Sequence, residues 1–193
     1  MNRSSRIGGP AAARQLLWVA TLGLTATGAG QAAAYRASEG TATFSYRVTV
    51  VTVNGNMNGV TASVTLDPQD LAATTGTVTV PVSTLKTGIT LRDTHAKGAE
   101  ALGTAKFPNA TFELTALTGG KLVEGQTVAT TATGRLTVKG ATKTVTAPIK
   151  ATLRDGKVNV STQFKFNPYD FNVRYPGGAT SVTVDVAFVL TGS

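Results

Sequence analysis

Apolar and polar residues alternate with a period of two along most of the chain. In residues 41–50 the even positions are apolar and the positions between them are polar. Successive side chains of a β-strand point to opposite faces, so this pattern predicts a strand with one buried face. The pair Val50-Val51 interrupts the alternation and predicts a bulge or a sharp bend, and Asn54-Gly55 is the turn expected after it.

Seven further segments repeat this pattern, and turn residues separate them. Asp155-Gly156 is the strongest hairpin signal among these turns. Only residues 81–108 do not follow the period of two, and there Asp93 is expected to cap one short helix near residues 93–102. The sequence therefore predicts an all-β domain of eight antiparallel strands, folded either as a sandwich or as a closed up-and-down barrel. The inward rows of the seven segments are Ala62, Val64 and Leu66; Val78, Val80 and Val82; Phe112, Leu114 and Ala116; Gly134, Leu136 and Val138; Val145, Ala147, Ile149, Ala151 and Leu153; Val158, Val160, Phe164 and Phe166; and Val182, Val184, Val186, Phe188 and Leu190.

Residues 1–34 have the features of a secretory signal peptide. Three Arg and no acidic residue precede the apolar stretch 16–28, and Ala32 and Ala34 fit an A-x-A cleavage site. A membrane-spanning helix needs ~20 strongly apolar residues, whereas this stretch is shorter and is diluted by Thr and Gly. We therefore expect cleavage near Ala34 and a mature single domain of residues 35–193, located in the periplasm or secreted into the medium.

The composition leaves little material for an active site. The chain has no Cys and one His, which excludes thiol chemistry and His-rich metal sites. It contains no nucleophile elbow, zinc-protease helix, phosphate-binding loop or EF-hand loop, and its acidic residues fall mostly at turns or on outward strand positions. We therefore expect a protein that is not an enzyme, with no catalytic residue, no metal site and no cofactor.

The positive charge is spread rather than clustered. The formal net charge is +8, but Lys and Arg occur singly along outward strand positions and only 6% of residues are aromatic. Proteins that bind single-stranded nucleic acid combine a basic groove with aromatic stacking platforms, so no nucleic-acid partner is expected. The basic residues of the hairpins between residues 134 and 165 suit either a solvated surface or a transient contact with anionic lipid head groups.

Two segments resemble the sequence signature of the YceI-like family. The first, residues 85–114, contains Thr87-Gly88, the pattern Arg-Asp-x-His at residues 92–95, and Phe-Pro-x-Ala-x-Phe at residues 107–112. The second, GRLTVKGATKTV at residues 134–145, is similar to a turn typical of the same family. The resemblance implies an exported bacterial protein, in some members linked to stress, whose lipocalin-like antiparallel barrel holds a polyisoprenoid or a similar amphiphile. The chain departs from the family in having no His within residues 46–50, and its interior is expected to be less polar.

The inward rows and the resemblance together give the candidate site. Arg92 and Asp93 are expected to form an ion pair or a helix cap, and His95 to fix the helix against the barrel; these three residues are structural in this interpretation. The candidates for lining a ligand cavity are Phe44, Tyr46, Val48, Val64, Val80, Phe112, Leu114, Leu136, Ala147, Ile149, Phe164, Val184, Val186 and Phe188.

Two hypotheses of function follow from different classes of protein. In the first, the barrel binds, stores or transports an apolar isoprenoid-type lipid, such as an isoprenoid quinone or its biosynthetic relative. In the second, the barrel is packed solid and acts as an exported structural or stress-response protein through a protein partner. The sequence leaves the choice between a monomer and a homodimer open.

Overall fold

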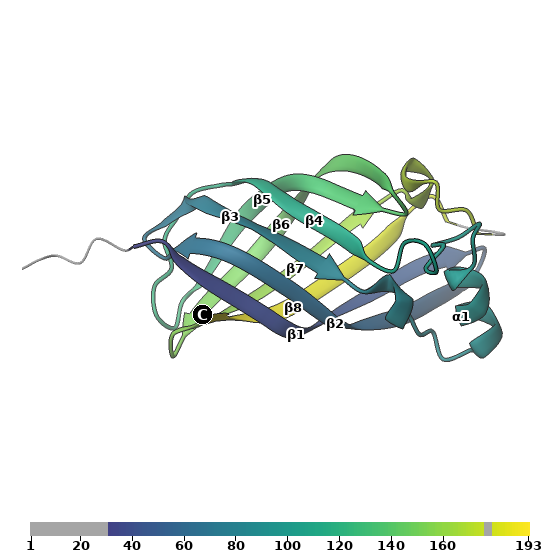
Figure 1. The fold of residues 1–193 in the computed structure, drawn as a ribbon, viewed down its shortest axis with the longest axis horizontal. Coiled ribbons are helices and arrows are strands. Elements are labelled where there is room, and N and C mark those ends of the chain that lie inside the picture. The colour runs from purple at the N-terminus through teal and green to yellow at the C-terminus, as the bar shows by residue number, and fades with distance from the viewer. Residues whose placement is uncertain (1–30, 176–178) are drawn as a thin grey trace, which may run out of the picture.

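The computed structural model describes residues 31–175 and 179–193, which form a closed barrel of eight antiparallel strands (Figure 1). Each strand pairs with the next along the chain, and β1 also pairs with β8, which closes the barrel. This confirms the predicted all-β, eight-stranded, lipocalin-like fold and decides for the barrel over the sandwich. The strands are β1 (Ala33–Val48), β2 (Val51–Asp67), β3 (Asp70–Val80), β4 (Ala110–Leu117), β5 (Thr127–Val138), β6 (Ala141–Arg154), β7 (Lys157–Phe166) and β8 (Val182–Gly192).

The first hairpin differs from the predicted one. The chain reverses at Thr49-Val50, where Thr49 has a φ of 52°, whereas Asn54 and Gly55 lie inside β2. This turn is the sharp bend predicted at Val50-Val51, and the pairing of β1 with β2 shifts register only between residues 37 and 41. Gly55 is required within the strand because the ring of Phe44 occupies the space that its Cβ would need.

The predicted cleavage point lies close to the start of the barrel. Strand β1 begins at Ala33, and Tyr35, the first residue of the expected mature chain, already pairs with Val64 of β2 and Gly192 of β8. Residues 1–30, which hold most of the expected signal peptide, lie outside the described residues. Among the described residues, no helix is long and apolar enough to span a membrane.

The helix begins and ends earlier than predicted. Helix α1 comprises Thr90–Lys97 rather than residues 93–102, so Asp93 belongs to its first turn instead of preceding it. The short 3-10 helix η1 (Val82–Thr84) lies in the same connection as α1, between β3 and β4. A second short 3-10 helix, η2 (Pro168–Phe171), lies in the connection between β7 and β8. Figure 1 shows α1 at one end of the barrel and the C-terminus at the other.

The interior contains two packed clusters rather than one continuous core. At the α1 end, Phe171 of η2 and Val60 of β2 are among the most deeply buried side chains. At the opposite end, Leu71 of β3 and Val158 of β7 are equally buried. Val78 of β3 and Phe188 of β8 pack against both clusters and are themselves only partly buried. An inward side chain that is only partly buried lines an internal space.

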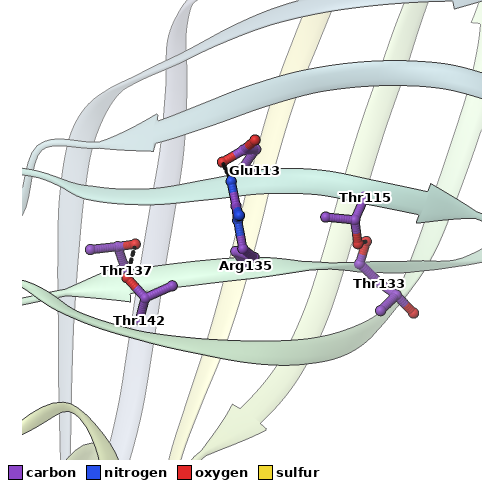
Figure 2. Close-up of polar contacts among 6 residues, drawn as sticks. All are labelled: Glu113, Thr115, Thr133, Arg135, Thr137 and Thr142. Atoms are coloured by element: carbon purple, nitrogen blue, oxygen red, sulfur yellow. Dashed lines mark hydrogen bonds and ion pairs between the residues drawn. The ribbon is translucent and has the colours of Figure 1, made fainter.

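The outer face is polar and bound together by contacts between strands (Figure 2). Arg135 of β5 donates a hydrogen bond to Glu113 of β4 over 2.6 Å. This hydrogen bond is the largest cause of the raised pKa of the Arg135 guanidinium, and the negative charge of the Glu113 carboxylate is the second. Thr137 and Thr142 share a hydrogen bond of 2.8 Å across β5 and β6. Cross-strand pairs of this kind are a main source of sheet stability, which accounts for the abundance of Thr at outward positions.

Candidate ligand-binding cavity

A cavity of about 310 Å³ occupies the barrel between the two packed clusters. All eight strands contribute to its lining, and so do the connections that carry α1 and η2. All the candidate residues named from the sequence line it except Val48. Val48 is the last residue of β1 and pairs with Val51 beside the turn. The hairpin extends beyond the lumen there. The alternation shows which face of the strand Val48 is on, but it does not show that the strand has already left the lumen.

The residues that line the cavity are Phe44, Tyr46, Val64, Val80, Phe112, Leu114, Leu136, Ala147, Ile149, Phe164, Val184, Val186 and Phe188 from the predicted set, together with further residues such as Met57, Leu71, Thr74, Leu85, Ala96, Leu102, Leu122, Thr130 and Tyr175. Several of the additional residues come from segments without a period of two, including residues 81–108. Those segments carry no repeating signal, so the sequence could not assign their side chains to the interior.

Two phenylalanines lie flat against the wall because a neighbouring strand has a glycine there. Phe44 pairs directly with Gly55, and the ring of Phe112 lies beside Gly134 of β5. A Cβ at either glycine would overlap the adjacent ring. The missing side chains therefore provide the space into which the rings fold. Rings placed along the wall leave the middle of the barrel open for a ligand.

Two tyrosines make the α1 end of the lining more polar. The rings of Tyr46 and Tyr175 meet edge to face with their centroids 6.3 Å apart. Burial raises the pKa of Tyr46, the nearby Tyr175 raises it further, and Arg92 acts in the opposite direction. The Tyr46 hydroxyl therefore stays protonated at neutral pH, so it can donate a hydrogen bond at this end of the cavity.

Arg92 and Asp93 of α1 both bind Thr87, which lines the cavity. The Thr87 N–H donates to Asp93 Oδ1 over 2.8 Å, and the Thr87 hydroxyl donates to the same oxygen. Arg92 Nε donates to Thr87 Oγ1 over 2.8 Å, and Nη2 donates to the Thr87 carbonyl over 2.7 Å. The Thr87 hydroxyl bond is the largest cause of the lowered pKa of Asp93. The expected ion pair or N-terminal cap is therefore corrected: both side chains bind the segment that precedes α1.

His95 does not fix the helix against the barrel. Its side chain is exposed, and within the described residues its imidazole makes no hydrogen bond. It lies on the outward face of α1, whereas the neighbouring Ala96 lines the cavity. The structural role expected for His95 is therefore wrong, because a one-residue step on a helix turns a side chain away from the barrel.

The two sequence motifs meet at the α1 end. Lys139, in the turn between β5 and β6, donates through Nζ to the Glu100 carbonyl over 2.8 Å and to the Asn172 carbonyl over 2.9 Å. Gly140 of the same turn has a φ of 76°, and a Cβ there would approach Phe107 to 2.9 Å. The turn thus ties together the connections that bear α1 and η2, and these connections cover one end of the cavity.

The lining is mostly apolar. Among the described residues that line the cavity there is no Asp, Glu, His, Lys or Arg, and the polar side chains are threonines and tyrosines. Within the described parts of the chain, no group of three or more His, Cys, Asp or Glu residues is placed to hold a metal ion. A closed antiparallel barrel with such an interior has the architecture of the small-ligand-binding barrels.

The YceI-like domain matches residues 34–191, so the chain belongs to the YceI-like family. No curated protein sequence matches this chain. The barrel is similar to BcnA of Burkholderia cenocepacia, with a TM-score of 0.67 and 22% identity over 78% of this chain and 95% of that one.

A second similar structure is a polyisoprenoid binding domain from Saccharophagus degradans implicated in plant cell wall breakdown, with a TM-score of 0.67 and 12% identity over 84% of this chain and 100% of that one. A third is the YceI protein of Campylobacter jejuni, with a TM-score of 0.60 and 18% identity over 77% of this chain and 89% of that one. At these identities the likeness establishes a shared fold.

Proposed function

We propose that this protein binds, stores or transports an apolar isoprenoid-type lipid in the barrel interior, outside the cytoplasmic membrane and without catalysing a reaction on it. The observation that carries this proposal is the cavity of about 310 Å³ with an almost wholly apolar lining. The similar polyisoprenoid binding domain from Saccharophagus degradans supports the choice of ligand class. An isoprenoid quinone or its biosynthetic relative is the ligand we favour.

The size of the cavity sets the scale of binding. A cavity of ~150 Å³ admits one benzene molecule, and this cavity of about 310 Å³ is twice as large. It therefore accommodates roughly a dozen carbon atoms, and at ~0.8 kcal/mol for each buried methylene their transfer from water is worth about 10 kcal/mol before the costs of ordering. Transfer from a bilayer is nearly neutral, because both environments are apolar. Such a barrel exchanges its ligand with a membrane but does not release it to water.

The absence of charged groups from the described lining supports binding over catalysis. The interior has tyrosine and threonine hydroxyls to orient a ligand, but no carboxylate or imidazole that would act as a general acid or base. The alternative, a solid barrel that acts through a protein partner, is disfavoured because a cavity of about 310 Å³ remains inside the barrel.

The leader at residues 1–34 supports export of the protein.

The α1 end of the barrel supports contact with a membrane. Val50 in the first hairpin turn and Leu91 in α1 are 78% and 66% exposed, although both are large and apolar. Figure 1 places this hairpin and α1 at the same end of the barrel. We infer that this end, which also carries the β5–β6 turn with Lys139, contacts the lipid surface during exchange.

Native mass spectrometry tests the proposed function. The protein should be purified without detergent after expression from the full-length gene, and measured before and after extraction with organic solvent. The proposal predicts a population with additional mass that the solvent removes and that fragments as an isoprenoid. A protein that is always free of extractable lipid, and that also takes none up from lipid vesicles, would contradict it.

A further inference from the structure

The barrel wall has an incomplete seam between β6 and β7. The pairing of these two strands stops at Ile149 and Thr162. Residues 141–148 of β6 still pair with β5, and residues 163–166 of β7 still pair with β8, on their other sides. Within the described residues, these two stretches therefore have no strand partner on the sides that face each other. We call this gap between residues 141–148 and 163–166 the seam.

The seam begins at a proline. Proline has no backbone N–H, so within sheets it is confined to edge strands and bulges. Pro148 of β6 lies directly beyond the last β6–β7 pair, and its carbonyl accepts a hydrogen bond of 2.7 Å from the side-chain hydroxyl of Thr162. A side-chain hydrogen bond thus stands at the point where backbone pairing ends. The sequence itself keeps β6 from continuing its ladder with β7.

Lys143 of β6 shows that water reaches the inner side of the wall at the seam. It pairs with Leu136 of β5, which is buried and lines the cavity. Residues directly opposite each other in an antiparallel pair lie on the same face of the sheet, so Lys143 is on the inward face of β6. Its side chain is nevertheless exposed, although Val138, nearer the turn, is buried. A lysine is tolerated there because its ammonium extends past the open edge of β6 into water.

The side chains on the two inner edges of the seam are apolar and only partly buried. They are Val145 of β6 and Phe164 and Phe166 of β7, and all three line the cavity. The two rings lie with their centroids 6.1 Å apart. These rings form the cavity side of the seam, and they can rotate without breaking any backbone hydrogen bond between strands.

Two other places where neighbouring strands do not pair along their full length are closed by different contacts. At the end opposite α1, Leu71 of β3 donates its N–H to the Gly120 carbonyl over 3.0 Å, and Leu71 and Leu122 are both buried. At the α1 end, Asn56 of β2 and Lys86 exchange two backbone hydrogen bonds of 2.9 Å. The seam has apolar side chains with accessible surface in place of such contacts.

We propose that the seam between β6 and β7 is the portal through which the lipid enters and leaves the cavity, sideways through the barrel wall. The inference rests on the proposed function and adds the route that the ligand takes. The α1 end is covered by the connections that bear α1 and η2, and η2 also contacts β6 beside the seam. At ~3.3 Å per residue the stretch 163–166 is ~13 Å long, which is enough for a hydrocarbon chain to pass.

A cross-link across the seam tests the portal. The chain has no cysteine, so two introduced thiols can be joined selectively. In Thr146→Cys/Lys165→Cys both positions are exposed on the outer face, one on each edge of the seam, and a short bismaleimide joins them. The probe is ubiquinone-2 in phosphatidylcholine vesicles, and its uptake is followed by separating protein from vesicles at intervals. We expect uptake to slow roughly tenfold or more, because any other route through the wall has to break backbone hydrogen bonds. The amount bound at equilibrium should not change.

The matched control places the same cross-link across a continuous ladder. Thr133→Cys/Thr146→Cys shares one cysteine with the first variant and joins β5 to β6, where the two threonine hydroxyls already share a hydrogen bond of 3.2 Å. Cross-linking there should leave the rate of uptake unchanged.

A second pair of variants tests the rings without a cross-link. Phe164→Ala removes a ring from the seam, and Phe112→Ala removes the same ring from the wall at β4. Both variants enlarge the cavity, but only Phe164→Ala widens the portal. We expect faster uptake in Phe164→Ala alone, and equal acceleration in both variants would overturn the assignment.

The outcomes separate the portal from the proposed function. A wild type that takes up no quinone from vesicles would contradict lipid binding itself. A wild type that takes up quinone, together with a cross-linked seam that does so at the same rate, would overturn the portal while lipid binding stands. Equal slowing by the seam cross-link and by the β5–β6 cross-link would overturn the portal as well.

Discussion

Replacing Ala147 by Trp would place an indole ring inside the barrel. Ala147 of β6 is buried, lines the cavity and pairs with Ala132 of β5, which is also buried and lines the cavity. An indole needs somewhat more room than the ~150 Å³ that admits a benzene molecule. The cavity of about 310 Å³ offers that room and would lose more than half of it to the ring.

The two functional hypotheses give opposite results for this variant. If the space is kept for a ligand, Ala147→Trp should fold with a free energy of unfolding within ~1 kcal/mol of wild type and carry less than half the lipid. If the interior were filled, overpacking would cost ~1–3 kcal/mol or more. For a domain of this size each kcal/mol lowers the thermal midpoint by ~2–4 °C.

The assay measures thermal midpoint and solvent-extractable lipid on the same preparation. Ala129→Trp is the control, because Ala129 lies on the outward face of β5 and is exposed, so its ring would enter solvent. The control should keep both stability and lipid. A strongly destabilised Ala147→Trp, together with a wild type that never carries lipid, would refute the carrier hypothesis.

Four further predictions concern the wall, the α1 segment, export and exchange. Gly134→Ala should lose ~1–3 kcal/mol of stability and also lipid, because the new Cβ overlaps the Glu113 carbonyl and displaces the Phe112 ring toward the lumen; unchanged lipid content would show that the ring does not limit the cavity. Because the folded-state pKa of Asp93 is lowered, the stability that its carboxylate contributes is present above about pH 4 and is lost as the pH falls through the folded-state value. Thermal midpoints of wild type and Asp93→Asn should therefore converge in acid, and parallel curves would contradict this. N-terminal sequencing of the exported protein should begin at or within a few residues of Tyr35, and an intact leader on a membrane-bound form would overturn export. Leu91→Asp should slow ligand transfer between vesicles without changing the amount bound, and an unchanged transfer rate would exclude this end as the contact surface.

The alternation of side chains predicted the strands because it is a local property of each strand, whereas the closed barrel was implied by the resemblance to the YceI-like family. Inward residues such as Phe112 and Ile149 follow directly from the period of two, and the structure places them in the cavity lining. The same rule cannot show where a strand leaves the lumen, which is why Val48 was misplaced. It also cannot distinguish a turn glycine from one that receives an aromatic ring, and Gly55 is the second kind.

The α1 end was predicted least well, because its structure depends on contacts between distant segments. Thr87 binds the side chains of Arg92 and Asp93, and Lys139 reaches two connections more than 30 residues away in sequence. The sequence motifs marked these residues as a group, but their partners are set by closure of the barrel. His95 belongs to the same motif and yet points to solvent, so membership of a motif did not give its role.

Native mass spectrometry of wild type, with extraction and fragmentation of whatever it carries, tests the central claim most directly. The account predicts a bound isoprenoid that contains oxygen, retained in water, removed by organic solvent and replaced when the protein is incubated with vesicles that contain the same lipid. A protein that is homogeneous at the mass of its polypeptide, before and after such incubation, would contradict it.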